Sequence, residues 1–411
     1  MKKVFIIGLG IGSIEYMHKK ALETIEVCDC LIGAKRMLKD FLYTNKQIYE
    51  SSNAENICEY IINEKCKTYG VLVSGDSGFY SLSKKMTEVL LKREDVQVVN
   101  ISAVSSLQYF ASKLNLPWDN IKYVSAHGRN TNIASNVIFN KETFILTSSD
   151  FGPNNICEIL TTKGLGYLKV SVGENLSYDN ERIVEDVASV IAKMKFEGLA
   201  VMIVHNYEFI SIDEGYRSIK DDEFVTGKAP MTKSEVRTIS VGKLNLRDDD
   251  TVYDIGAGTG SVSVEAALKL RNGTVYAVEK DTEAITLIEK NIEKFKTYNI
   301  EVIKGTAPEN IENLPNPDSC FIGGSSGNMS EIISVVLRKN PYVNLVINTV
   351  TLQSLNEAVN CMEKYRFNDV EIVSVSVAKA KKIGKYDLMM GQNPIYIISG
   401  KGSGYCEIKS T

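Results

Sequence analysis

A glycine-rich loop carries the clearest chemistry in this sequence. Residues 251–267 read TVYDIGAGTGSVSVEAA, in which an apolar strand ends at Asp254, three glycines follow at alternate positions, and a helix begins near Ser261. Glycines allow a backbone to approach a ligand closely, and a helix N-terminus favours a negative group. The dinucleotide fingerprint G-x-G-x-x-G would need a third glycine where Ser261 stands, so the spacing disfavours a nicotinamide cofactor.

The strand after this loop supplies an acidic partner. TVYAVE ends in Glu279, and a carboxylate at that strand end can accept hydrogen bonds from both hydroxyls of a ribose. The pattern D-x-G-x-G-x-G followed by such an acid resembles the Rossmann-like S-adenosylmethionine methyltransferases. The resemblance implies that the cofactor is held by Asp254, Gly256, Gly258, Thr259, Gly260 and Glu279, with Ala307 of GTAPE near the adenine.

The segment FIGGSSGN, residues 321–328, bears on the methyl acceptor. Methylases of nucleic-acid amino groups carry [DN]-P-P-[FY] at the end of this strand, and that motif is missing here. We interpret Gly323 and Gly324 as residues that open room for a large, flat acceptor that is not a nucleotide.

The segment PMTKSEVR precedes the glycine loop and has two interpretations. Thr232 and Glu235 have the spacing of a capping box at a helix N-terminus. Thr232 is also a candidate cofactor contact. Lys233 and Arg237 are candidate ligands for substrate carboxylates, with solvated surface charges as the alternative.

The letters GDSG at residues 75–78 raise the question of a nucleophile at Ser77. A serine nucleophile needs a base, and the chain has only three histidines (His18, His127 and His205) and no Ser-His-Asp constellation. The strand that runs into this segment predicts instead a tight turn whose backbone approaches a ligand, with Asp76 beside it.

Composition is that of a globular protein. The 411 residues are 44% hydrophobic and 24% charged, and the formal net charge of −4 lacks the basic excess usual for proteins that bind nucleic-acid phosphates. Eight scattered cysteines without a C-x-x-C pair predict buried thiols in a reducing compartment and no metal site. Glycines break the apolar start, and no stretch approaches the length of a membrane span, so we expect a cytoplasmic protein.

Alternating strands and helices must position these motifs. Apolar runs such as VFIIG, CLIG, VLVSG and VQVVNI alternate with helix-like segments, a second α/β segment covers residues 121–208, and the pattern restarts after Pro230. Buried strands separated by helices predict parallel α/β architecture. We expect domains at residues 1–210 and 229–411, joined by a linker at residues 211–228.

The first half does not repeat the second fold. Its glycine loop IIGLGIGS is followed by the strand CLIGAKR, which ends without an acid. This half resembles the tetrapyrrole methylases, whose two α/β subdomains enclose the cofactor. The resemblance implies cofactor contacts from Gly8, Gly10, Gly75, Asp76, Ser105 and Ser106.

Other motifs of the first half extend the resemblance. Ser77 stands where the family commonly has the proline of G-D-P, and the triplet HGR follows the next strand. Because the substrate that the resemblance implies carries many carboxylates, His127 and Arg129 are candidate substrate contacts, with a strand-end structural histidine as the alternative for His127. VGENLSYDNERI, residues 172–183, matches a later family motif. Its Glu174 either orients an amide or hydroxyl of the ring or caps a loop, and we favour the loop.

Together the halves resemble the fused precorrin methylases of cobalamin biosynthesis over nearly all of residues 1–400. The resemblance implies one S-adenosylmethionine site per domain, carbon-5 methylation by the first half, and carbon-15 methylation with decarboxylation of the ring-C acetate by the second. It also implies a precorrin or cobalt-precorrin substrate, no nucleic acid, no membrane and a homo-oligomer, and it assigns no catalytic acid or base. Two alternatives stay open: an RNA or protein methyltransferase, and a non-enzymatic sensor or scaffold with one degenerate half.

Overall fold

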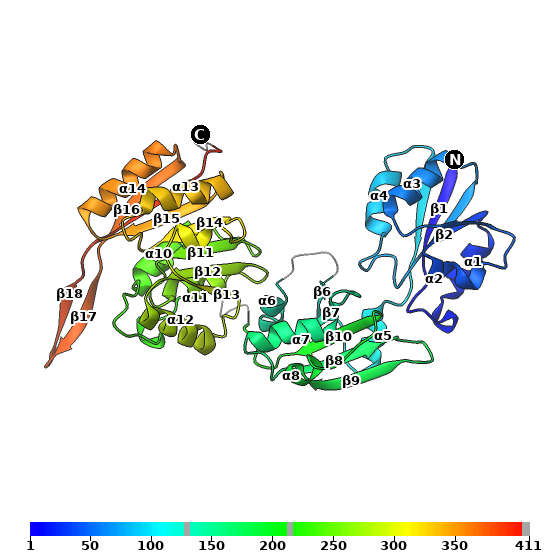
Figure 1. Cartoon of the computed structure of the whole chain (residues 1–411), viewed down its shortest axis with the longest axis horizontal. Helices are drawn as coiled ribbons and strands as arrows, with labels where there is room; N and C mark the ends of the chain where they lie inside the picture. Colours follow the sequence, from blue (N-terminus) through cyan, green and yellow to red (C-terminus); the bar gives the residue numbers. More distant parts are fainter. Residues whose placement is uncertain (127–131, 212–216, 405–411) are drawn as a thin grey trace. The chain divides into compact units, whose positions relative to one another are not determined.

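The chain folds as two compact units (Figure 1). The computed structural model describes residues 1–126, 132–211 and 217–404. The first unit comprises residues 1–130 and 142–205, and the second comprises residues 131–141 and 206–411. The second unit therefore includes a short segment from the first half. It also includes much of the predicted linker, because Ile219 and Phe224 are buried side chains rather than parts of a free connection.

The first unit begins with a fully parallel sheet in the order β3-β2-β4-β1-β5. Its apolar strand residues alternate between two cores, one shared with α3 and α4 and the other with α1 and α2. The elements are β1 (Lys2–Gly8), η1 (Ile14–Tyr16), α1 (Lys19–Glu26), β2 (Cys30–Gly33), α2 (Lys35–Leu38), η2 (Lys39–Phe41), β3 (Gln47–Glu50), α3 (Ala54–Asn63), β4 (Thr68–Val73), α4 (Ser83–Leu90) and β5 (Val96–Ile101).

A second sheet completes the first unit, in the order β6-β7-β10-β8-β9. Only β6 and β7 are parallel, and the other neighbours are antiparallel, which the expectation of parallel sheets had not included. The elements are α5 (Ser106–Lys113), β6 (Lys122–Ser125), β7 (Glu142–Leu146), α7 (Pro153–Thr162), β8 (Lys169–Glu174), β9 (Arg182–Val187), α8 (Ala188–Ile191) and β10 (Ala200–His205).

The second unit is built on a seven-stranded sheet in the order β13-β12-β11-β14-β15-β19-β16. The first five strands are parallel, and β19 and β16 continue the sheet antiparallel. The elements are α6 (Ile133–Ile138), η3 (Asp221–Glu223), α10 (Ser234–Lys243), β11 (Thr251–Ile255), α11 (Ser261–Ala267), β12 (Thr274–Glu279), α12 (Thr282–Phe295), β13 (Ile300–Lys304), η4 (Glu309–Ile311), β14 (Ser319–Ile322), α13 (Met329–Lys339), β15 (Asn344–Thr349), α14 (Leu352–Lys364), β16 (Asn368–Val375), β17 (Ala378–Ile383), β18 (Tyr386–Gly391) and β19 (Ile395–Lys401).

Helices cover both faces of this sheet. Alternate residues of β14 show the arrangement: Cys320 and Ile322 join the core with α13 and α14, whereas Phe321 joins the core with α10 and α11. The carboxyl ends of the parallel strands are therefore left to the loops that follow them. In open α/β sheets these loops form the ligand crevice.

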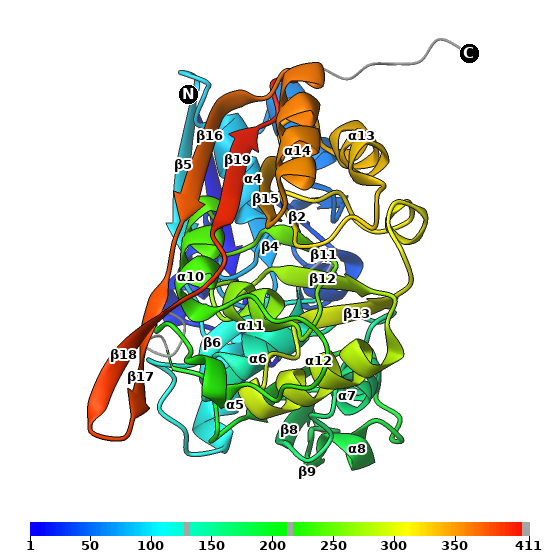
Figure 2. The same cartoon turned by 90° about the vertical axis from the view of Figure 1, so that its left-hand side faces the viewer.

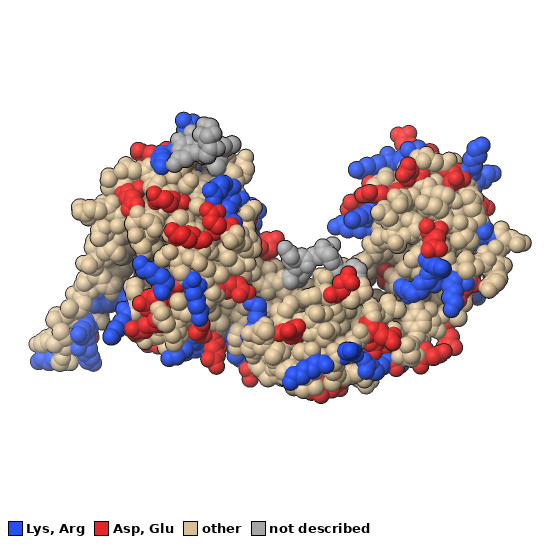
Figure 3. Space-filling view, viewed as in Figure 1, with Lys and Arg blue, Asp and Glu red and all other residues tan. Residues whose placement is uncertain are grey.

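A two-stranded hairpin, β17–β18, projects from the second unit (Figures 1 and 2). On the face shown in Figure 3, Lys and Arg side chains are interspersed with Asp and Glu rather than gathered into a basic stripe. Within the described residues, no helix combines the length and apolarity needed to cross a membrane.

Candidate functional site

The glycine loop of the second unit is shaped by close backbone packing. Gly256, Gly258 and Gly260 have φ values of +71°, +57° and +74°, which L-residues with side chains rarely adopt. A Cβ at Gly256 would lie 2.7 Å from the carbonyl oxygen of Gly324, and one at Gly258 would lie 2.5 Å from that of Pro230. The loop after β14 and the PMTK segment thus meet the glycine loop at positions where only glycine fits.

Glu279 ties this loop to the end of β12. One carboxylate oxygen accepts a hydrogen bond from the backbone N–H of Gly258 at 2.9 Å. The other accepts from the N–H groups of Lys280 and Asp281 at 2.8 and 3.0 Å. A carboxylate has about four lone-pair sites, so the side chain is fixed in place and retains acceptor capacity for a ligand.

These loops border a pocket with about 320 Å³ of empty space. Four predicted residues line it, namely Gly256, Glu279, Ala307 and Gly324. Gly258 packs against Pro230 and Gly260 against Ile288, and Gly323 packs near Phe321 and Gly256 instead of opening room for an acceptor. At Gly324 a Cβ would meet nothing within 4 Å, so that position does leave space.

Sequence reasoning missed a cation at this pocket. Lys280 lines it, and its ammonium group donates to the hydroxyl of Ser326 at 2.9 Å. The contact joins the loop after β12 to the loop after β14. The sequence did contain a signal that could have placed Lys280 at the site. Lys280 directly follows the strand-end acid Glu279, and Ser326 lies within FIGGSSGN.

Asp254 and Thr259, both predicted cofactor ligands, lie beneath the loop instead of lining the pocket. The Asp254 side chain is 1% exposed, and one of its oxygens accepts from the Ser263 hydroxyl of α11 while the other lacks a partner among the described residues. Burial raises the pKa of Asp254 to about 7. The Thr259 side chain is fully buried, and the Thr259 carbonyl accepts from Asn291 of α12. Both residues therefore anchor the loop to neighbouring helices.

The raised pKa of Asp254 makes a pH-dependent contribution to stability. The unfolded carboxyl has the ordinary aspartate pKa of 3.8, whereas the pKa of the folded one is about 7. The stabilising contribution is complete below about pH 4 and is lost as the pH rises toward 7. We expect Asp254→Asn to flatten this dependence in urea unfolding followed by circular dichroism at pH 5 and pH 8. Asp249→Asn, at an exposed position, should leave the dependence as it is, and an equal slope in Asp254→Asn would contradict the assignment.

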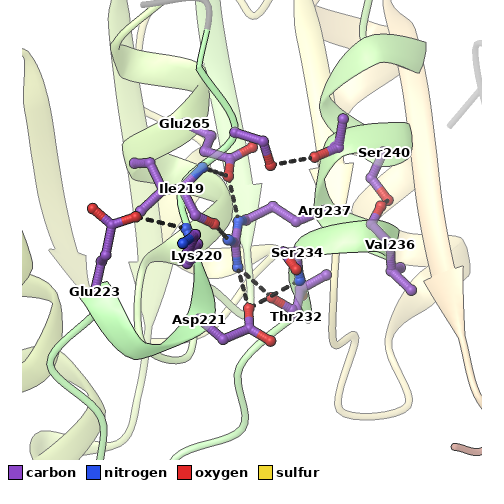
Figure 4. Close-up of polar contacts among 12 residues, drawn as sticks. Ile219, Lys220, Asp221, Glu223, Thr232, Ser234, Val236, Arg237, Ser240 and Glu265 are labelled. Atoms are coloured by element: carbon purple, nitrogen blue, oxygen red, sulfur yellow. Dashed lines mark hydrogen bonds and ion pairs between the residues drawn. The ribbon is translucent and has the colours of Figure 1, made fainter. Parts of the chain in front are cut away.

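Arg237 does not face a ligand site (Figure 4). Its side chain is 0% exposed, and Nε donates to a Glu265 carboxylate oxygen at 2.7 Å. The remaining guanidinium nitrogens donate to the carbonyls of Thr232 and Ile219 and to Asp221. The prediction of a substrate ligand was wrong here, because the guanidinium is buried and four hydrogen bonds join it to η3, to α11 and to the segments before η3 and α10.

The predicted capping box is also absent. Helix α10 begins at Ser234 with Lys233 as its N-cap, and no side chain caps it. Glu235 pairs instead with Lys379 of β17 at 3.0 Å. Lys233 is exposed, and Thr232 lies two residues from the Pro230 carbonyl that packs on Gly258, so their predicted ligand contacts stay predictions.

In the first unit, the glycine turn after β1 meets the GDSG turn after β4. Gly10 and Gly75 form an antiparallel bridge, with N–H···O distances of 3.2 and 2.8 Å. A Cβ at Gly8 would lie 2.8 Å from the Gly75 carbonyl oxygen and 2.9 Å from Ala103. Three strand-end loops, after β1, β4 and β5, therefore converge, and the cofactor contacts expected from them stay predictions.

Asp76 fastens two of these loops together. Its carboxylate accepts from the N–H of Gly78 within its own turn and from that of Ala103 after β5, each at 2.8 Å. Ser77 is buried with its backbone beside Gly8, so it is not presented as a nucleophile. Ser105 is the N-cap of α5 in a capping box with Gln108.

Two predicted residues of the first site, His127 and Arg129, lie outside the described residues. Glu174 is buried, accepts from Arg182 at 2.7 Å and also accepts from the backbone of Glu197, in agreement with a structural role.

Two domain families match this chain. Residues 3–192 match the tetrapyrrole (corrin/porphyrin) methylases, and residues 222–400 match the precorrin methyltransferase domain.

Individual relatives match one half or nearly the whole length. A probable cobalt-precorrin-6B C(15)-methyltransferase (decarboxylating) of Saccharolobus solfataricus is 42% identical over 178 residues, which is 42% of this chain and 88% of that protein. A precorrin-6Y C(5,15)-methyltransferase (decarboxylating) of Sinorhizobium sp is 26% identical over 387 residues, 92% of this chain and 91% of that protein. A solved structure of precorrin-6y C5,15-methyltransferase from Geobacter metallireducens is 41% identical over 45% of this chain and 96% of its own, with a TM-score of 0.43.

Proposed function

We propose two separate sites of methyl transfer on this chain, which belongs to the precorrin methyltransferases. It is an S-adenosylmethionine-dependent C-methyltransferase that also decarboxylates its substrate, in cobalamin biosynthesis. In our proposal each unit holds one cofactor, the first methylates carbon 5 of a precorrin or cobalt-precorrin ring, and the second methylates carbon 15 and removes the ring-C acetate carboxylate. We keep the predictions of a homo-oligomer and of a cytoplasmic location.

The observation that carries the two-site proposal is that each unit builds its own glycine cradle at the carboxyl ends of parallel strands. The cradles differ in construction: Gly256 and Gly258 pack under Gly324 and Pro230 in the second, whereas Gly8 packs on Gly75 in the first. A relative named for carbon 15 alone matches over 178 residues, about the length of one such domain. This supports the assignment of one reaction to each unit.

The residues of the second cradle fit S-adenosylmethionine. Glu279 has acceptor capacity for ribose hydroxyls, Ala307 and Ile332 form an apolar part of the pocket wall suited to an adenine, and Gly256 allows close backbone approach. The cofactor supplies a methyl group already activated on a sulfonium sulfur.

The residues of the chain then have to align the acceptor ring with the methyl group, hold the two in place and exclude water. In the second unit the bonds from Gly258 to Glu279 and from Lys280 to Ser326 fix the loops that surround the pocket. In the first unit Asp76 fixes the corresponding loops. Electrons released when the acetate is decarboxylated can enter the conjugated ring of the substrate, so this step needs no electron sink from the protein.

Product counting tests the proposal. The purified chain, supplied with acceptor ring and methyl-labelled cofactor, should give two labelled methyl groups and one carbon dioxide per ring. Parallel reactions with cobalt-containing and metal-free rings identify the substrate. Transfer to RNA or protein with none to the corrinoid would contradict the function, and a titration that found one cofactor per chain would contradict the two-site arrangement.

A further inference from the structure

An arginine of the first unit, beside the predicted cofactor site, carries a charge that no carboxylate among the described residues neutralises. Arg36 lies on α2, directly after β2, and is exposed. Its guanidinium donates to the hydroxyl of Tyr178 at 3.0 Å and to that of Ser74 at 3.4 Å. Both acceptors are neutral, and among the described residues Arg36 forms no ion pair. A guanidinium has five N–H donors and keeps its charge at every physiological pH, so most of its capacity is open.

Ser74 places this arginine at the GDSG turn. Strand β2 pairs with β4 in parallel, so the residues after the two strands emerge at the same edge of the sheet. Ser74 follows β4 and precedes Gly75 and Asp76, which meet the loops after β1 and β5. Arg36 therefore lies next to the loops that form the first cradle.

Tyr178 ties the same arginine to the glycine turn after β1. Gly12 has φ +125°, and a Cβ there would lie 2.4 Å from the Tyr178 ring. The neighbouring Ser177 hydroxyl accepts from the Ser13 N–H and donates to the Ile11 carbonyl, each at 3.2 Å. This loop belongs to the VGENLSYDNERI motif, so the motif holds the turn in place and presents the tyrosine hydroxyl to Arg36.

We propose that Arg36 binds a carboxylate side chain of the tetrapyrrole substrate and thereby positions the ring at the first site. The inference rests on the proposed function, in which this unit methylates a carboxylate-rich ring. A planar guanidinium fixed by two neutral hydroxyls offers paired N–H donors to a carboxylate, which gives orientation as well as attraction. The methionine carboxylate of the cofactor has the same chemistry, and the experiment must distinguish the two sources.

The test compares Arg36→Met with wild type in the full chain. The KM for the corrinoid in carbon-5 methylation should rise by about 10- to 100-fold, the effect of losing a charge-assisted hydrogen bond. The KM for S-adenosylmethionine and the carbon-15 reaction should be unchanged. Tyr178→Phe, which keeps the ring on Gly12 and loses the hydroxyl, should raise the corrinoid KM by a smaller factor. Lys39→Met, which removes an exposed cation from the adjoining η2, should change neither KM.

Each other outcome decides against the inference. A rise in the KM for S-adenosylmethionine would assign Arg36 to the cofactor and overturn the substrate role. If Arg36→Met methylates carbon 5 normally with an unchanged corrinoid KM, the substrate role of Arg36 is overturned and the proposed function is not. Wild-type protein that fails to methylate the corrinoid would overturn the proposed function, and this inference with it.

Discussion

Replacing Gly258 with alanine should abolish cofactor binding in the second unit while leaving the first unit intact. Gly258 has φ +57°, a conformation that costs a residue with a side chain about 1–2 kcal/mol. The added Cβ would also lie 2.5 Å from the Pro230 carbonyl oxygen, a backbone atom that cannot rotate away. Relief of this clash would move the N–H that Gly258 donates to Glu279. Displacement of a cradle by about 1 Å can cost about 100-fold in rate.

Titration with S-adenosylmethionine measures this loss without depending on the order of the two methylations. Wild type should bind two molecules per chain, and Gly258→Ala should bind one. Asp76→Asn should also bind one, because it should lose the site of the first unit instead. Asparagine has one acceptor oxygen for the two N–H groups that Asp76 now binds. The control is Gly242→Ala on α10, where a Cβ meets nothing within 4 Å. Two cofactors bound by Gly258→Ala, or none, would contradict the prediction.

Replacing Arg237 with alanine should destabilise the second unit by about 3–5 kcal/mol, the usual cost of removing one partner from a buried ion pair. The change would leave Glu265, which is 5% exposed, without its cation, and it would strip the carbonyls of Ile219 and Thr232 of a donor. It would also remove the guanidinium that lies 4.7 Å from the centroid of the Phe224 ring. The three segments that meet at Arg237 would lose their common partner.

The position of the single tryptophan allows the stability of each unit to be measured separately. Trp118 lies in the first unit, so its fluorescence reports that unit, whereas circular dichroism reports both. In urea, the circular dichroism transition of Arg237→Ala should shift to lower concentration and the Trp118 transition should not. Lys304→Ala, which removes an exposed pair with Glu289, should cost less than about 1 kcal/mol. The double change Arg237→Met and Glu265→Leu should recover stability, and its failure to do so would contradict the ion-pair explanation.

The sequence predicted the architecture best where burial leaves a strong pattern. The α/β class was confirmed, and α11 begins at Ser261 as expected. The strands that were not predicted lie where burial is weak. Strands β3, β9 and β16 are each at the edge of a sheet, and β17 and β18 form the exposed hairpin. No residue of these five strands is buried, so their sequences lack the apolar run used to recognise the others, including the edge strand β5.

The residues of the candidate sites also differ in how well the sequence predicted them. Gly256 and Glu279 could be located because they lie at the ends of parallel strands, whose carboxyl ends meet at one edge. Whether a charged residue faces solvent or the interior could not be read from its type, and for that reason Arg237 was given a ligand role. Arg36 was overlooked because its local sequence, GAKR, is unremarkable, and its importance lies in contacts with residues as distant as Tyr178.

The membership of α6 in the second unit has a consequence for how these halves can be divided. All six residues of α6 are buried, Ser135 donates to the carbonyl of Arg271, and Asn132 donates to that of Gly273. The chain thus crosses from one unit to the other three times. A cut near residue 206 would leave α6, a helix of the second unit, attached to the first fragment. Its buried side chains would then be exposed to water. Separate expression of the two units therefore needs a division of the chain that keeps α6 with the second fragment.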